Sequence, residues 1–196
     1  FTGVTATADN TSAFTVSAGA TATEGIHELT VTALAKAQRS VSSTYALATT
    51  SINGGAAMSL SLNYQGTAST INVTAGSDTP QGVVDAINIA NKGVKAQLVY
   101  TSSADASPYK ILLTSATGED NDFTLTDSDG NLSFTDLQTA QDAAFSIDGI
   151  SYKRSSNTVT DALQGVSISM RSLATTSIQL SRETTSTAEK VQNLVL

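Results

Sequence analysis

The feature that most constrains this chain is the dipeptide Asp148-Gly149, which separates two segments of alternating apolar and polar residues. Asp-Gly accepts the positive φ angles of a two-residue type I′ turn, so the flanking segments are predicted to pair as an antiparallel hairpin. In that register Ile147 faces Ile150 and Phe145 faces Tyr152, with all four side chains on one face. A two-stranded ribbon is marginal in water, and the hairpin therefore requires further strands.

Two other segments can supply such strands. Residues 166–170 alternate between apolar and polar side chains and predict a third strand. Before it, residues 161–164 predict one helical turn, which Gly165 ends in a left-handed conformation. The early segment His27–Ala35 alternates as well, and we expect it to be the missing partner of the hairpin, although a long insertion separates the two in the sequence.

The composition favours a sheet-rich protein with a hydroxyl-covered surface. The 196 residues include 30 threonines and 26 serines, with 14% charged residues, no cysteine, no tryptophan and one histidine. The net charge of −7 argues against nucleic acid and anionic membrane surfaces as partners, because both require clustered cations. No apolar run is long enough to span a bilayer. Without cysteine the chain has no disulfides and no thiolate metal site.

Changes in the periodicity divide the chain into a mainly β, α+β protein of two domains. A first boundary is predicted near Ala48, and the roughly 85 residues after it are predicted to form a self-sufficient α+β unit. The first strand of the chain is expected around Phe14 and the last around Ile178. The residues from 183 to 196 contain a capping box and helical spacing, which predict the start of a helix that continues beyond a fragment.

The inserted domain contains the clearest predicted helix. Thr79 can cap it, Pro80 fits its first position, and residues 83–90 form an apolar stripe that ends near Asn91. Strands are predicted at residues 58–64, 70–74, 94–100, 109–114 and 123–126, joined by turns or loops at 52–55, 65–69, 102–108 and 127–131.

No constellation of residues predicts catalysis or metal binding. His27 is the only histidine and lies in the apolar register of a strand, without a second histidine or a cysteine as partner. A hydrolase triad has no G-x-S-x-G segment to support it. The segment Asp127-Ser128-Asp129-Gly130-Asn131 begins like a calcium loop, but Leu132 replaces the required glycine and Gln138 replaces the bidentate glutamate. Asp120 and Asp122 beside Glu119 indicate a solvated loop. We therefore expect no enzyme, no cofactor and no metal.

Three N-x-S/T tripeptides begin at Asn10, Asn72 and Asn131. Such tripeptides arise by chance in a sequence this rich in serine and threonine, so we do not interpret them as glycosylation sites.

Several segments resemble, in order and spacing, the bacterial flagellar hook-associated protein 2 family, the filament caps. The resemblance runs from about Thr30 to Arg182 and is most specific where Ile147-Asp148-Gly149 is followed by Arg154-Ser155-Ser156-Asn157 and then by Asp161 to Val166. The other matching segments are Leu34–Arg39, Ala86-Ile87-Asn88 with Gly93–Ala96, and Leu112–Ser115 with Thr117-Gly118.

The resemblance implies a non-enzymatic structural protein, located extracellularly at the flagellum tip. It implies a ring of copies of the full-length protein, and flagellin as the partner whose folding and insertion are promoted. The resemblance also implies a split β-rich domain of residues 1–48 and 136–182, which would be the family's outer domain 2. An α+β domain inserted at residues 49–135 would be its outer domain 3. Without the family's helical legs, the fragment is expected to be monomeric or weakly associated.

A second hypothesis is an adhesin or glycan-binding module that contacts a host surface receptor or mucin. It is motivated by hydroxyl-rich strands and polar loops, and glycan stacking would fall to Tyr64, Tyr100, Tyr109 or Tyr152.

Overall fold

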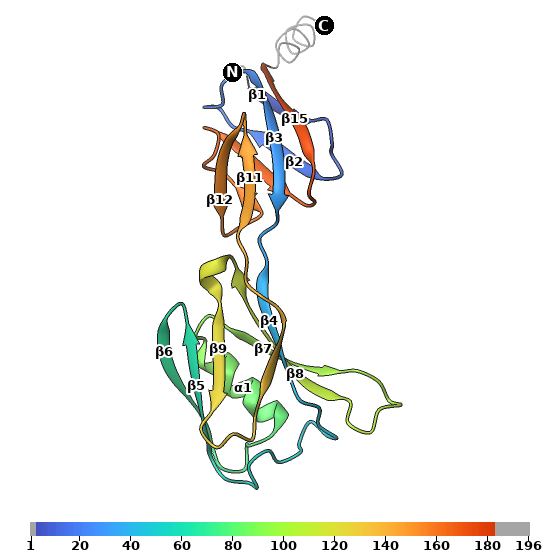
Figure 1. Cartoon of the computed structure of the whole chain (residues 1–196), viewed down its shortest axis with the longest axis vertical. Coiled ribbons are helices and arrows are strands. Elements are labelled where there is room, and N and C mark those ends of the chain that lie inside the picture. Colours follow the sequence, from blue (N-terminus) through green and yellow to red (C-terminus); the bar gives the residue numbers. More distant parts are fainter. Residues whose placement is uncertain (1–2, 183–196) are drawn as a thin grey trace, which may run out of the picture. The chain divides into compact units, whose positions relative to one another are not determined.

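The computed structural model describes residues 3–182, and these divide into two compact units. The first unit joins residues 3–35 to residues 142–182, and the second is the continuous segment Lys36–Gln141. Figure 1 shows β3 and β11 side by side in the first unit, although one lies early and the other late in the sequence. The fold is mainly β, as predicted.

The first unit packs a five-stranded sheet against a three-stranded one. The larger sheet has the order β1-β15-β3-β11-β12 and the smaller one β13-β14-β2. Their bounds are β1 Val4–Ala8, β2 Phe14–Ala18, β3 Gly25–Ala33, β11 Ala143–Ile147, β12 Ile150–Arg154, β13 Thr158–Val159, β14 Val166–Met170 and β15 Thr175–Arg182.

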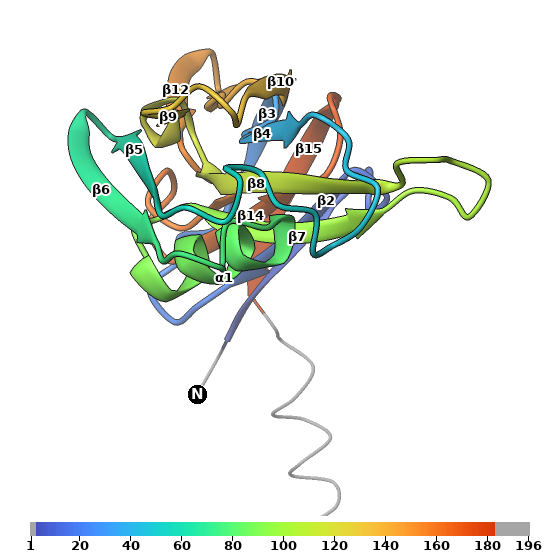
Figure 2. The same cartoon turned by 90° about the horizontal axis from the view of Figure 1, so that it is seen from below.

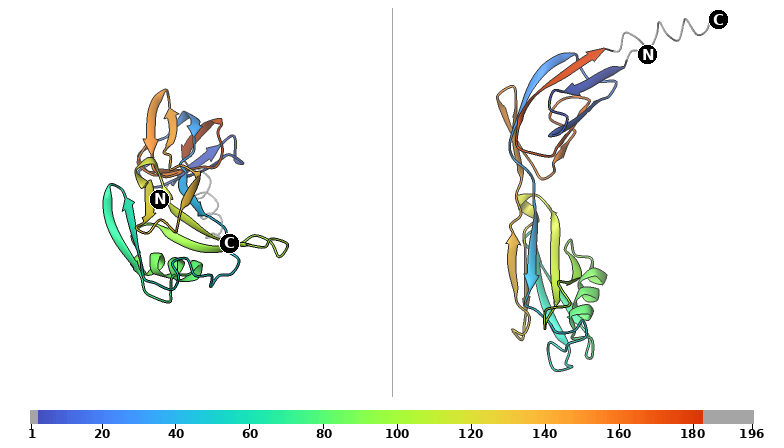
Figure 3. Two further views of the ribbon diagram at one scale, coloured as in Figure 1. Left: turned by 60° about the horizontal axis from the view of Figure 1, so that its bottom comes forward. Right: turned by 90° about the vertical axis from the view of Figure 1, so that its right-hand side faces the viewer.

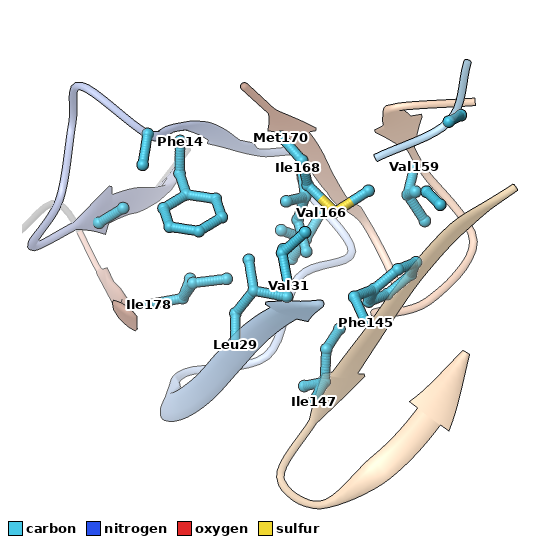
Figure 4. Packing of buried hydrophobic residues seen from close by; sticks show 14 of the residues in the cluster. Phe14, Leu29, Val31, Phe145, Ile147, Val159, Val166, Ile168, Met170 and Ile178 are labelled. Atoms are coloured by element: carbon cyan, nitrogen blue, oxygen red, sulfur yellow. The ribbon is translucent and has the colours of Figure 1, made fainter. Parts of the chain in front are cut away.

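The core of the first unit forms between these two sheets because alternate residues of each strand are apolar. Figure 4 shows Leu29 and Val31 of β3, with Phe145 of β11, directed toward side chains of β14. Ile178 of β15 is fully buried in the same cluster.

The second unit contains two sheets and a helix. The sheets have the orders β10-β4-β8-β7 and β6-β5-β9. The bounds are β4 Ala37–Ser42, β5 Met58–Tyr64, β6 Thr67–Val73, α1 Pro80–Ala90, β7 Lys95–Tyr100, β8 Tyr109–Thr117, the 3-10 turn η1 Glu119–Asn121, β9 Phe123–Asp127 and β10 Phe134–Gln138. Figure 2 shows α1 beside β7 and β8, and Figure 3 shows the helix on one side of these strands. Its residues Val83, Val84 and Ile87 are buried in the unit's core.

The helix has the ends that the sequence predicts. Thr79 is the N-cap and its side chain accepts a hydrogen bond from the Gly82 amide, Pro80 follows at the start, and Asn91 ends the helix with a φ of 47°. The tight turn at Gln65 and Gly66 has positive φ at both residues, and β6 begins directly after it. The prediction of a turn over 65–69 was therefore wrong for its second half.

The two predicted domain boundaries, after residue 48 and before 136, differ from the division in the structure. Residues 36–48 lie in the second unit, because β4 pairs with β8 on one side and with β10 on the other. The sequence misleads here because Gln38, Ser40 and Ser42 resemble a solvent-facing polar row. In the structure all three are buried and hydrogen-bonded.

Two further predictions change. Residues 166–170 form the expected strand, but it pairs with β2 and β13 in the smaller sheet instead of extending the hairpin. Residues 161–164 form bends and a turn instead of a helical turn, although Gly165 has the predicted left-handed φ of 70°. The predicted helix start after residue 182 lies outside the described residues.

Candidate functional site

The segment from residue 142 to residue 171 closes the first unit, and its hairpin has the predicted register. Ile147 pairs with Ile150 and Phe145 with Tyr152, and the turn residues Asp148 and Gly149 have φ angles of 51° and 81°. The rings of Phe145 and Tyr152 stack with centroids 5.3 Å apart. The predicted pairing of the hairpin with the early segment His27–Ala35 is also confirmed, because β3 pairs with β11 on the side opposite β12.

The single histidine contacts the turn of this hairpin. His27 Nδ1 lies 2.7 Å from Asp148 Oδ2, while Asp148 Oδ1 accepts a hydrogen bond from the Glu28 amide at 2.9 Å. The His27 hydrogen bond, followed by that from Glu28, lowers the pKa of Asp148 below its ordinary value. The pair joins the start of β3 to the turn, and the structure gives no nucleophile contact to His27 among the described residues.

Asn157 forms a two-point contact with the backbone where the chain leaves the first unit. Its Nδ2 donates to the carbonyl oxygen of Ala35, and its Oδ1 accepts from the amide of the same residue. The side-chain amide thereby replaces a neighbouring strand at this position.

Close by in sequence, Arg154 donates to both carboxylate oxygens of Asp161, which lowers the pKa of Asp161 and raises the pKa of Arg154.

Asn88 makes the same kind of contact in the second unit. Its Nδ2 donates to the Ala96 carbonyl at 2.8 Å, and its Oδ1 accepts from the Ala96 amide at 3.0 Å. Helix α1 thereby covers part of the open edge of β7, which would otherwise expose unpaired backbone groups. Asn88 and Asn157, which lie in the segments that resemble the family, therefore both hydrogen-bond to backbone groups within the fold.

In the loop at residues 127–131, an acidic side chain accepts hydrogen bonds from backbone amides of the same loop. Asp127 accepts hydrogen bonds from the amides of Asp129 and Asn131, which is an Asx-type turn, and the Asp129 carboxylate accepts from the Asn53 side chain. No group of acidic or histidine residues within 3–182 has the spacing to hold a metal ion. Asp120 and Asp122 are exposed on either side of Asn121, whose Oδ1 accepts from Tyr64 and Gln65.

Asp78 is a buried carboxylate that the sequence prediction missed. It is 1% exposed and accepts hydrogen bonds from Ser51 Oγ at 2.6 Å and from the amides of Asn53 and Gly55. These bonds, led by that of Ser51, lower the pKa of Asp78 to about 2. All of these partners lie in the loop before β5, so Asp78 organises a turn. In the sequence, Asn53-Gly54-Gly55 signals a turn, but it does not identify Asp78 as the acceptor for the amides of that turn.

The four tyrosines considered for glycan stacking are divided between the two units. Tyr64, Tyr100 and Tyr109 belong to the second unit and Tyr152 to the first, and only Tyr100 is more than half exposed. Tyr100 and Tyr109 meet edge to face, with ring centroids 5.2 Å apart.

The asparagines of the three N-x-S/T tripeptides, Asn10, Asn72 and Asn131, each make a side-chain hydrogen bond within the chain. Within residues 3–182, no helix combines the length and apolarity that crossing a membrane requires.

Comparison with known proteins gives two family matches in chain order. Residues 59–117 match the flagellin hook IN motif, and residues 140–196 match the flagellar hook-associated protein 2 C-terminus. The curated flagellar hook-associated protein 2 of Salmonella typhimurium is 27% identical over 140 residues, and that of Escherichia coli is 28% identical over 174. The chain is therefore similar to the flagellar hook-associated protein 2 family.

Solved structures of the family share the fold. The D2-D3 domains of the Escherichia coli flagellar cap protein FliD match with a TM-score of 0.81 and 24% identity, covering 93% of this chain and 100% of that one. A structure of the D1-D2-D3 domains from the same organism gives 0.82 at 23% identity, covering 96% of this chain and 62% of that one. The chain spans 29% of the Salmonella relative and 36% of the Escherichia coli relative.

In this chain, the sequence prediction missed β1 and β10 as well as the Asn157 and Asn88 contacts. The alternation of Thr5 and Thr7 with Val4, Ala6 and Ala8 was the available signal for β1, hidden in a threonine-rich stretch. The segments of the resemblance contain both asparagines, but spacing alone does not show what an asparagine side chain contacts.

Proposed function

We propose that this chain forms the outer part of a cap at the tip of a bacterial flagellar filament. The observation that carries the proposal is the match of residues 140–196 to the hook-associated protein 2 C-terminus. That match covers the hairpin, the Asn157 contact and β14, which are the parts that close the first unit.

In this proposal the first unit corresponds to the outer domain D2 and the second to D3. The coverage of the Escherichia coli D2-D3 structure supports the assignment, because that whole structure matches within this one chain. The cap acts outside the cell, as a ring of the full-length protein, and promotes the folding and insertion of flagellin without catalysis. The two asparagines of the matching segments, Asn88 and Asn157, support the fold and are not proposed as binding residues.

The insertion can be removed without separating the ends that remain. Lys36 and Gln141 form an antiparallel bridge, with their amides donating to each other's carbonyl oxygens at 2.8 and 3.0 Å. A short Gly-Ser loop can therefore replace residues 37–140. In the parent protein, replacing residues 37–140 tests whether filament assembly requires the second unit. Deleting residues 3–182 tests whether assembly requires the whole segment.

The experiment uses a strain that lacks its own cap protein and receives the parent protein or one of these two deletions. We expect the deletions to shorten the filaments seen by electron microscopy and to raise the amount of unpolymerised flagellin in the medium. The unaltered parent protein is the positive control, and equal secretion of all three is checked by immunoblotting. Normal filaments with the 3–182 deletion would show that this segment has no part in assembly.

A further inference from the structure

One face of the four-stranded sheet in the second unit is open and carries cations. The opposite face contributes Ala96, Ile111 and Leu113 to the buried core. The outward residues include three cations and three partly buried aliphatic side chains, which together we call the basic face: Arg39, Lys95 and Lys110 with Val41, Val99 and Leu112. None of these aliphatic residues belongs to the core cluster or packs against it.

The strand register places the cations in a defined pattern. Thr114 pairs with Arg39 of β4 on one side and with Lys95 of β7 on the other. Neighbouring strands are about 4.8 Å apart, so Arg39 and Lys95 lie about 10 Å apart in one row. The next row contains Val41 and Leu112, which are also direct partners. An aliphatic strip therefore lies beside a pair of like charges.

These cations have no acidic neighbour on their own face of the sheet. Within the four described strands the only carboxylate is that of Asp136, which accepts hydrogen bonds from the buried Gln38 and Ser40 and so lies on the opposite face. Arg39, Lys95 and Lys110 make no ion pair with any residue that the structure describes, and Lys95 Nζ donates a hydrogen bond to Asn91 Oδ1 at 2.8 Å. In the first unit, by contrast, Arg154 pairs with Asp161 and Arg182 with Glu24.

The chemistry of the face selects the class of partner. A chain with a net charge of −7 repels nucleic acid and anionic lipid at long range, whereas a protein surface with a local group of carboxylates fits three cations around an aliphatic strip. The second unit itself contains such a group. Its acidic loop, residues 118–122, carries Glu119, Asp120 and Asp122, and all three are exposed.

We propose that the basic face of one copy of this chain docks on the acidic loop of a second copy. The contact is heterologous, since each copy uses a different surface, and it leaves one surface of each kind free for further copies. The choice of a second copy as the partner rests on the proposed cap function, while the face itself is argued from charge and register alone.

The test is charge reversal on the whole chain, followed by sedimentation equilibrium over a concentration series at low and high salt. The face variant is Arg39→Glu with Lys95→Glu, and the loop variant is Asp120→Lys with Asp122→Lys. We expect the unaltered chain to associate at low salt and each variant alone to associate at least about tenfold more weakly. Mixing the two variants restores association, because the reversed face then meets the reversed loop.

The controls separate this contact from net charge and from misfolding. Arg171→Glu reverses an exposed cation in the first unit and is expected to leave association unchanged, whereas Arg39→Glu weakens it. Restored association in the mixture also shows that both variants are folded. The proposal is overturned if the unaltered chain stays monomeric at low salt at every concentration, or if the face variant associates as the unaltered chain does. Neither result bears on the cap function, which the filament experiment tests separately.

Discussion

The carboxamide of Asn157 holds both backbone groups of Ala35, with its Oδ1 2.7 Å from the amide nitrogen and its Nδ2 2.9 Å from the carbonyl oxygen. Residue 35 lies just after β3, where the chain passes from the first unit into the insertion. Asn157 lies beyond the hairpin, on the returning segment. One side chain thus joins the outgoing and returning parts of the split unit.

Replacing Asn157 by alanine should therefore destabilise the first unit. The substitution leaves the Ala35 N–H and C=O without their partner, and an unsatisfied buried backbone group costs about 1–3 kcal/mol. Urea unfolding followed by circular dichroism measures the loss, and hydrogen exchange at the Ala35 amide locates it. Gln164→Ala, an exposed amide in the same unit, is the control and should change little. An unchanged midpoint for Asn157→Ala would show that water replaces the side chain at no cost.

Asp78 makes the second unit sensitive to acid. Its ordinary pKa of 3.8 falls to about 2 in the folded chain, so the ionised form is favoured by folding. The resulting stability is fully present above the unfolded-state pKa near 3.8 and is lost as the pH falls through about 2. Stability measured by urea unfolding should therefore decline between these pH values.

The variant Asp78→Asn tests the origin of that decline. The amide cannot accept the bonds from Ser51, Asn53 and Gly55 as the carboxylate does, so the variant should be less stable at neutral pH and less dependent on pH below about 4. Asp120→Asn, at an exposed position, should retain the wild-type pH profile. A profile for Asp78→Asn that parallels the wild type would assign the acid sensitivity to other carboxylates.

Gly82 should resist replacement by alanine although it lies within a helix. Alanine is ordinarily better than glycine there by about 1 kcal/mol. A Cβ at residue 82, however, would lie 2.0 Å from the carbonyl oxygen of Ser77. We expect Gly82→Ala to lower the thermal midpoint, whereas Ile89→Ala on the exposed face of the same helix should leave it unchanged or raise it. A more stable Gly82→Ala variant would mean that the segment before the helix shifts freely.

Gln38 should be required for the contact between the two sheets of the second unit. Its Nε2 donates to the Phe123 carbonyl at 2.9 Å, and its Oε1 accepts from the Phe123 amide at 2.7 Å, which connects β4 to β9. Gln38→Met retains the volume but leaves these groups unpaired, at an expected cost of about 1–3 kcal/mol. Gln97→Met, on the outward side of β7, provides the matched control. Equal stability of the two variants would contradict a structural role for Gln38.

The sequence alone determined the elements whose cause is local. Asp148 and Gly149 accept positive φ, which fixes the hairpin register, and Thr79, Pro80 and Asn91 set the ends of the helix. Alternation predicted β5, β7 and β14 because each strand has one buried face. The resemblance to the family was likewise visible in the sequence, because it rests on the order and spacing of short segments.

Only the tertiary structure decided which polar residues face inward and which strands meet. Gln38, Ser40 and Asp78 look like surface residues until their buried partners, far away in the sequence, are known. For the same reason the position of the unit boundary shifted, since pairing of β4 with β8 and β10 is a long-range choice. Periodicity reports the difference between two faces of a strand, but a buried polar face that is hydrogen-bonded gives the same pattern as a solvated one.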